Sequence, residues 1–93
     1  MAGQDASHDA VRVWLNPRLA LPKKRSLTIS GHRTSITLED AFWAELKGAA
    51  TDMGLTVAAL VASIDTCREP AGLSAAIRVF LLARRSAPSS QKR

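Results

Sequence analysis

Hydrophobic and polar residues alternate one by one over two short stretches of the chain. In RSLTIS (residues 25–30) and RTSITL (residues 33–38), leucine and isoleucine alternate with serine and threonine. A period of two residues is typical of β-strands with one buried face. The pattern predicts two short strands, and Gly31-His32 between them is suited to a tight turn. One face would carry Leu27, Ile29, Ile36 and Leu38, and the opposite face Thr28, Ser35 and Thr37.

The period changes to that of an amphipathic α-helix directly after the second strand. An apolar stripe that begins at Phe42 predicts a helix over residues 39–53, and a glycine follows as a suitable C-terminal stop. Thr56 is a good N-cap for a second helix, over residues 56–68. A third helix begins near Ser74 and has apolar residues on two sides. The fold class is therefore mainly α with a short β-ribbon, in the order β-α-α plus a third, C-terminal helix.

The chain has the length of one domain with extensions. We expect a flexible N-terminal arm over residues 1–22, a domain over 23–82 and a basic polar tail over 83–93. The second strand and the first two helices span only 36 residues. Units shorter than about 40 residues usually need a disulfide, a metal or a partner chain.

Two strand pairings would complete this small unit. The strand at 33–38 pairs either with 26–30 of the same chain or with its own copy in a second chain, across a two-fold axis. The second arrangement gives an antiparallel ribbon and an intertwined homodimer. The ribbon would present Arg33 with the polar strand face to a DNA major groove. The dimer core would consist of Ile36, Leu38, Phe42, Leu46, Val57, Leu60, Val61 and Ile64.

Charge is segregated along the chain. Residues 10–38 contain six Lys and Arg residues and no acid, whereas residues 39–69 contain six acids and two bases. A basic segment of this kind points to a polyanion, with nucleic acid ahead of an anionic membrane surface. Solvated basic tails are the alternative reading of the same charges.

Catalytic and metal-binding patterns are not found in the sequence. One cysteine excludes an internal disulfide, and two histidines with that cysteine do not have metal-site spacing. There is no Gly-rich phosphate loop, no nucleophile–base set and no apolar run near the ~18 residues of a membrane span. We therefore expect no enzyme activity, no cofactor, no metal and no membrane partner, and a cytoplasmic location.

The strand RTSITL, the helix EDAFWAELKGAATDM that follows without a loop, and GLT ahead of VAALVASID resemble the ribbon-helix-helix superfamily of Arc- and CopG-like repressors. The surrounding KRSLTISGH and LSAAIRVFLL are similar to a small bacterial subgroup of ribbon-helix-helix proteins. The resemblance covers about residues 23–82. It implies a homodimeric, sequence-specific transcriptional regulator that binds double-stranded DNA.

The resemblance also implies roles for individual residues. The strand residues that would contact bases are Arg33, Ser35 and Thr37. Backbone N–H groups of Leu55, Thr56 and Val57, at the start of the second helix, would hold a phosphate, which the helix dipole also favours. The basic run Lys23, Lys24 and Arg25 would contact further phosphates.

A second hypothesis is a dimeric protein-interaction module, antitoxin-like or partner-binding, without a specific DNA target. In that case the C-terminal helix or the N-terminal arm would bind a protein partner. An exposed apolar patch on the C-terminal helix would favour this hypothesis.

Overall fold

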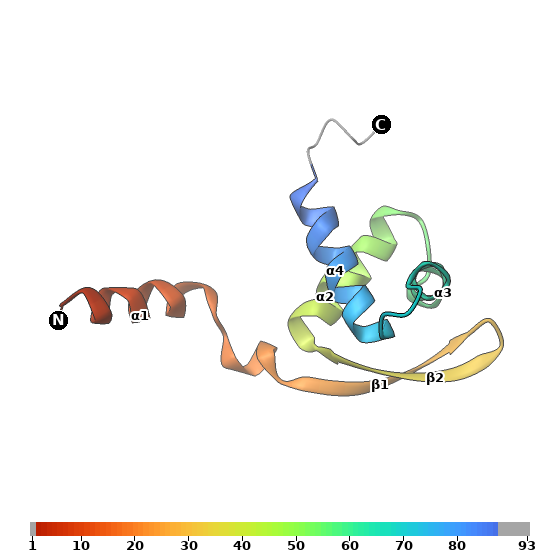
Figure 1. Cartoon of the computed structure of the whole chain (residues 1–93), viewed down its shortest axis with the longest axis horizontal. Helices are drawn as coiled ribbons and strands as arrows, with labels where there is room; N and C mark the ends of the chain where they lie inside the picture. The colour runs from red at the N-terminus through yellow and green to blue at the C-terminus, as the bar shows by residue number, and fades with distance from the viewer. Residues whose placement is uncertain (1, 88–93) are drawn as a thin grey trace.

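The computed structural model describes the backbone of residues 2–87 and the side chains from residue 8 onward. Figure 1 shows a long β-hairpin with helices on one side of it, and an N-terminal helix that projects away from them. This is the predicted order of ribbon, helix and helix with an added C-terminal helix. The elements are α1 (Ala2–Trp14), the 3-10 helix η1 (Pro17–Ala20), β1 (Pro22–Ile29), β2 (His32–Glu39), α2 (Asp40–Asp52), α3 (Val57–Cys67) and α4 (Leu73–Ser86).

The hairpin is longer than the sequence pattern indicated and turns one residue earlier. β1 and β2 pair antiparallel over eight residues each, and the last pair before the turn is Ile29 opposite His32. The turn consists of Ser30 and Gly31, with φ of 52° and 83°. Positive φ at both central residues is the type I′ geometry, whose twist matches that of the flanking strands. His32, which we expected in the turn, is therefore the first residue of β2.

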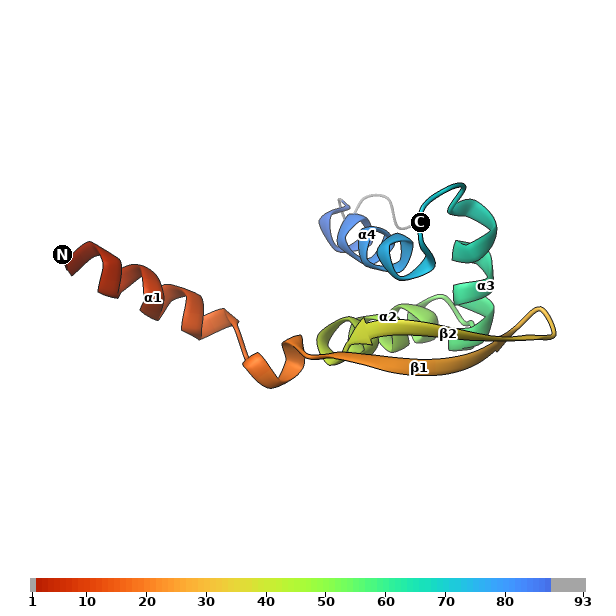
Figure 2. The same ribbon diagram turned by 60° about the horizontal axis from the view of Figure 1, so that its bottom comes forward.

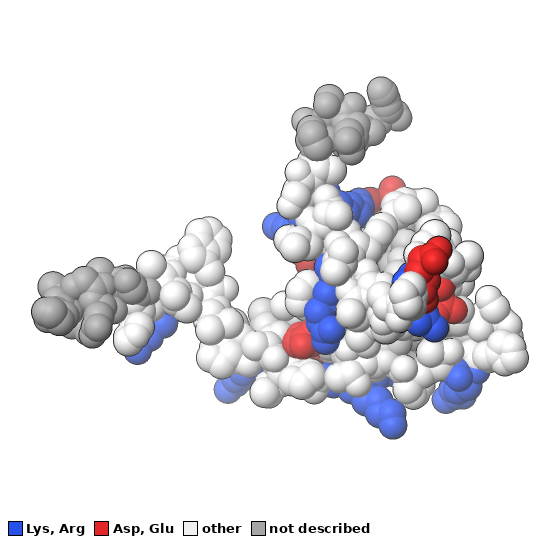
Figure 3. All heavy atoms as spheres, viewed as in Figure 1, with Lys and Arg blue, Asp and Glu red and all other residues white. Residues whose placement is uncertain are grey.

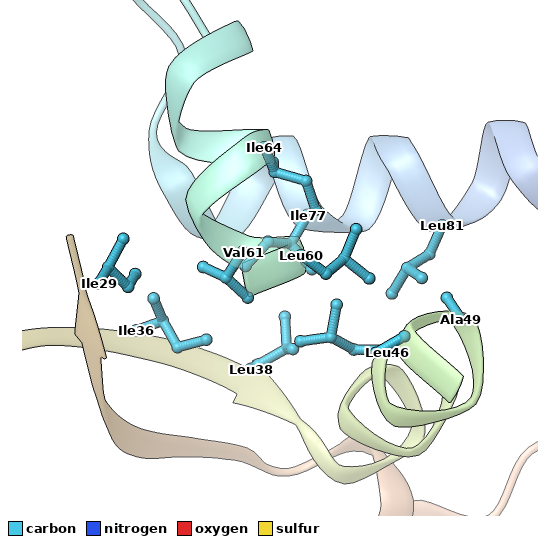
Figure 4. Packing of buried hydrophobic residues seen from close by; sticks show 11 residues of the cluster. Ile29, Ile36, Leu38, Leu46, Ala49, Leu60, Val61, Ile64, Ile77 and Leu81 are labelled. Carbon is cyan, nitrogen blue, oxygen red and sulfur yellow. The ribbon is translucent and has the colours of Figure 1, made fainter. Parts of the chain in front are cut away.

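One hydrophobic core lies between the hairpin and helices α2, α3 and α4 (Figure 4). Ile36 and Leu38 of β2 point into it because alternate strand residues face the same side. Of the eight residues expected in a dimer core, six are buried here, and Phe42 and Val57 pack against them half-buried. The buried residues are Ile29, Ile36, Leu38, Leu46, Ala49, Ala50, Leu60, Val61, Ile64, Ile77 and Leu81.

Residues of β1 and α4 complete this core within one chain. Of the two strand pairings that the sequence leaves open, β2 makes the one with β1 of the same chain. This differs from the two-chain ribbon that the resemblance implies. The physical reason is that a two-residue loop closes at small entropic cost, and β1 brings apolar Leu27 and Ile29 to the core. α4 adds Ile77 and Leu81, both buried against α2 and α3.

The connection from α2 to α3 is set by a glycine. Gly54 has φ of 70°, and its N–H donates to the Thr51 carbonyl at 3.1 Å while Leu55 N–H donates to the Ala50 carbonyl at 2.8 Å. These two bonds are a Schellman motif, which ends α2 as predicted. No single helix among residues 2–87 is long and apolar enough to cross a bilayer. α2 and α3 pass that test only as a pair bent by 99°.

The N-terminal arm contains a helix that stands apart from the core. α1 projects from the end of the hairpin in both Figure 1 and Figure 2, and the side chains of residues 8–22 are all exposed. η1 lies against α2. Residues 88–93 of the expected C-terminal tail lie outside the described residues, and its first residues, up to Ser86, belong to α4.

Two glycines provide a matched test of the hairpin turn. A Cβ at Gly31 or Gly48 would meet no heavy atom within 4 Å, so only backbone conformation distinguishes them. Gly31→Ala should destabilise the protein by about 1–2 kcal/mol because of its positive φ. Gly48→Ala, inside α2, should stabilise it by about 1 kcal/mol. Urea unfolding monitored by circular dichroism measures both, and a neutral Gly31→Ala would contradict the turn geometry.

Candidate nucleic-acid interface

The hairpin has one face towards the helices and one face towards solvent. Along β2, Thr34, Ile36 and Leu38 are partly or fully buried, and Arg33, Ser35 and Thr37 are exposed. β1 shows the same alternation. We call the solvent-facing side the outer face. It carries three cross-strand pairs, which are Lys24–Thr37, Ser26–Ser35 and Thr28–Arg33.

The outer face has the dimensions of a surface that reads a DNA groove. From the Thr28–Arg33 pair to the Lys24–Thr37 pair, each strand advances four residues, or about 14 Å. This length corresponds to about four base-pair steps of ~3.4 Å. Two strands about 4.8 Å apart also fit the width of a major groove, which is about 12 Å. The face can therefore lie in one major groove without help from another element.

The side chains of the outer face have the chemistry for base and phosphate contacts. Four of the six are Ser or Thr, whose hydroxyls both donate and accept hydrogen bonds. Arg33 is a bidentate donor, the geometry that matches the O6 and N7 atoms of guanine. Lys24 is a compact charge suited to a phosphate.

The charge of the outer face is not neutralised within the chain. Among the described residues, Lys24 and Arg33 take part in no ion pair. Figure 3 shows Lys and Arg atoms protruding along the lower margin of the molecule, where the hairpin lies in Figure 1, with the visible acids above it. This separation leaves a positive strip that attracts a polyanion.

Lys23 and Arg25 lie on the inner side of the hairpin and hold it to α2. Lys23 Nζ is 3.1 Å from Asp40 Oδ2, and the Arg25 guanidinium donates to Asp40 Oδ1. The hydrogen bond from Lys23, with that from Arg25, holds the pKa of Asp40 below its usual range. Arg25 also lies over the Trp43 ring, 4.7 Å from its centroid. The basic run thus divides, with Lys24 on the outer face and its two neighbours paired to an acid.

The start of α3 retains some of the donors expected there. Leu55 N–H is already bound to a carbonyl of α2, and the Thr56 hydroxyl accepts from Ala59 N–H at 3.0 Å. This confirms Thr56 as the N-cap. Within the described part of the chain, the N–H groups of Thr56 and Val57 have no hydrogen-bond acceptor. Two of the three predicted donors therefore remain available to an anion at a helix N-terminus.

α4 binds the edge of β2 that faces away from β1 at one residue, Thr37. The Thr37 N–H donates to Ser74 Oγ at 3.1 Å, and Arg78 Nη2 lies 3.4 Å from the Thr37 carbonyl oxygen. Arg78 also donates to both carboxylate oxygens of Glu39, at 3.0 and 3.1 Å. These hydrogen bonds from Arg78, with one from the Glu39 backbone, lower the pKa of Glu39. We call Ser74, Arg78 and Glu39 the edge clamp.

Two parts of this site were not predicted from the sequence. Ser26 was not singled out, because the basic run Lys-Lys-Arg ahead of it led us to place the start of the strand near Ser26. The strand begins earlier, at Pro22. The signal was present, since Ser26 lies two residues before Thr28 on the same strand and therefore faces the same side. The edge clamp left no sequence signal, because Ser74 and Arg78 are 37 and 41 residues from Thr37.

A two-stranded ribbon that supports a pair of helices and turns a polar face to solvent defines a class of DNA-binding domain. The ribbon-helix-helix domain model matches residues 22–84, and the chain belongs to this family. The family typically comprises DNA-binding regulators or antitoxins.

One solved structure is also similar to the chain. This is an uncharacterized protein from Bordetella pertussis Tohama I, with a TM-score of 0.68 and 26% sequence identity. The similarity covers 85% of this chain and 67% of that one. Comparison with curated proteins finds no match.

The lowered pKa of Glu39 predicts a dependence of stability on pH. A carboxyl whose pKa is lower in the folded state stabilises the protein above its unfolded pKa, about 4.3 for Glu. That contribution disappears as the pH falls from there through the folded value. Glu39→Gln should therefore lower the unfolding free energy at pH 7 by about 0.5–1 kcal/mol, and by progressively less below pH 4.

Asp52→Asn is the matched control for this prediction. Asp52 pairs with Arg84 at 3.0 Å but is more exposed than Glu39, so its loss should have a smaller effect. Urea unfolding at pH values from 7 to 2.5 gives both profiles. Equal and pH-independent effects of the two substitutions would show that the Glu39–Arg78 pair does not stabilise the fold.

Proposed function

We propose that the protein is a sequence-selective, double-stranded DNA-binding regulator of transcription that places the outer face of its hairpin in the major groove. The observation that carries the proposal is this face itself. It is polar, carries two unpaired cations and lies opposite a hairpin face that is fixed to the core. Membership of the ribbon-helix-helix family supports the same function.

Each part of the interface has a distinct role in this proposal. Arg33, Ser35 and Thr37 contact base edges, with Arg33 directed to guanine. Lys24 and the free N–H groups at the start of α3 contact phosphates and set the register on the duplex. Phosphate contacts provide much of the affinity, whereas base contacts provide the selectivity.

A salt titration with two substitutions tests this division of roles. The DNA is first selected from a random duplex pool, and binding to it and to a scrambled duplex is measured by fluorescence anisotropy. Arg33→Ala should weaken binding to the selected duplex by about 1–3 kcal/mol, roughly fivefold to 150-fold, and affect the scrambled duplex less. Lys24→Ala should weaken both similarly and reduce the slope of log K against log salt by about one.

Lys47→Ala is the control for general charge loss, because Lys47 is an exposed cation on α2 rather than on the hairpin. It should leave the preference for the selected duplex unchanged. If wild-type affinity does not depend on salt concentration, phosphate contact is absent and the proposed function is incorrect.

We propose that the homodimer forms through the outward stripe of α4, which consists of Val79 and Leu82. Val79 and Leu82 are each 66% exposed, although Ile77 and Leu81 on the other side of α4 are buried. A groove of about 470 Å³ between α3 and α4 borders the stripe, and apolar patches of this kind mark protein contacts. The second copy is the favoured occupant because members of the ribbon-helix-helix family commonly dimerise. Another protein partner, as in an interaction module, is the alternative.

Charge placed on this stripe tests the assignment. The double substitution Val79→Glu and Leu82→Glu should convert a dimer to a monomer in analytical ultracentrifugation, because two carboxylates cannot be buried in an apolar contact. Helical content should stay unchanged, since both side chains are exposed. The matched substitutions Val11→Glu and Val13→Glu on α1, two exposed apolar residues, should leave the dimer intact. A wild-type monomer, or a dimer that survives the α4 substitutions, would refute this assignment.

A further inference from the structure

We propose that Asp40 limits sequence-independent binding to DNA. It is a positioning residue that holds Lys23 on the inner side of the hairpin, so that only Lys24 of the basic run contacts phosphates. This inference rests on the proposed DNA-binding function and specifies how strongly the same site binds the DNA backbone. Asp40 itself does not touch the DNA.

Asp40 lies where the open end of the hairpin meets the first turn of α2. It follows Glu39, the last residue of β2, and Glu39 is paired with Pro22 at the start of β1. Lys23 comes next in β1, and its Nζ lies 3.1 Å from Asp40 Oδ2, whereas the Arg25 guanidinium donates to Oδ1. One carboxylate thus holds two cations, one with each oxygen. Both ion pairs join residues of the same chain, and neither involves the edge of β2 that faces away from β1.

The two cations differ in how far they could move if Asp40 lost its charge. The Arg25 side chain is 18% exposed and lies over the Trp43 ring, 4.7 Å from its centroid, so packing also keeps it inside. The Lys23 side chain is 56% exposed, and its four-carbon stem is flexible. Among the described residues, Lys23 forms an ion pair with Asp40 and with no other acid. Lys23 is therefore the cation whose position depends most on Asp40.

A freed Lys23 would add a phosphate contact to those of the outer face. Lys23 is one residue, about 3.3 Å, from Lys24 along β1, so its long side chain can reach the same stretch of DNA backbone once it is unpaired. Phosphate contacts of this kind supply essentially all of sequence-independent binding. Asp40 also places a negative charge beside the positive strip, and its lowered pKa keeps the carboxyl ionised at neutral pH.

The salt dependence of binding to the scrambled duplex tests this role. Asp40→Asn keeps the shape of the side chain and removes its charge. It should bind more tightly than the wild type at low salt and make the slope of log K against log salt steeper by about 0.9. Affinity should then fall about 3.5-fold more than that of the wild type between about 50 and 200 mM salt. A purely structural role would instead weaken binding, because a distorted hairpin loses contacts.

Asp52→Asn is the matched control for the change in charge. Asp52 lies at the other end of α2 and pairs with Arg84 of α4 at 3.0 Å, so its substitution frees a cation that does not belong to the hairpin. The slope of this variant should equal that of the wild type. Circular dichroism and urea unfolding establish that both variants are folded.

Lys23→Gln gives a second test that does not require Asp40→Asn to fold. In the otherwise unchanged protein it should leave the slope as it is, since Asp40 already neutralises Lys23. In the Asp40→Asn background it should return the slope to the wild-type value. A slope that is smaller by about one for Lys23→Gln alone would show that Lys23 contacts a phosphate in the wild type, and would overturn the inference.

The wild-type titration separates failure of this inference from failure of the proposed function. If the wild type is salt-dependent and folded Asp40→Asn has the same slope, only the role of Asp40 is overturned. If wild-type affinity does not depend on salt, the proposed function is overturned, and the role of Asp40 with it.

Discussion

The register between β1 and β2 is the constraint on which the rest of the structure depends. The Ser30-Gly31 turn sets Ile29 opposite His32, and every later pair follows from that one. Because side chains alternate between the two faces of a strand, a slip of one residue would move Ile36 and Leu38 from the core to solvent. The same slip would bury Arg33 and Ser35. Core packing and the polar outer face are therefore two consequences of a single register.

The register also determines which of the basic residues of β1 face the core side and which faces solvent. Lys23 and Arg25 are in phase with the core side and meet Asp40, which also lies at the positive end of α2. Lys24, between them, points outward and remains unpaired among the described residues. Three consecutive cations thus serve two purposes, because neutralisation of two of them fixes the hairpin to α2 while one is left for a polyanion.

α4 covers apolar surface that β2, α2 and α3 would leave exposed without it. Ile77 and Leu81 cover the apolar surface of α2 and α3 that 36 residues cannot cover alone. Ser74 and Arg78 satisfy backbone groups at the open edge of β2, and an open edge is otherwise free to pair with another chain. Val79 and Leu82 on the other side of α4 are exposed, so the helix that completes the core also presents apolar side chains to solvent.

Local pattern alone determined much of this protein. Alternation in RSLTIS and RTSITL predicted both strands and their apolar face, the stripe from Phe42 predicted α2, and Gly54 and Thr56 predicted how α2 ends and α3 begins. These features depend on neighbouring residues, so a sequence reveals them. The polar strand face with Arg33, Ser35 and Thr37 was predicted for the same reason, and the structure places all three on one exposed side.

Only the tertiary structure decided which strand lies beside β2 and which cations are paired with an acid. It also decided what binds the edge of β2 that faces away from β1. The sequence was compatible with a hairpin and with a two-chain ribbon, because both bury the same side chains of β2. The choice depends on contacts between residues about 40 positions apart, such as Ser74 with Thr37 and Arg78 with Glu39. Periodicity carries no information about such pairs, since their separation reflects how the helices pack and not how any one element forms.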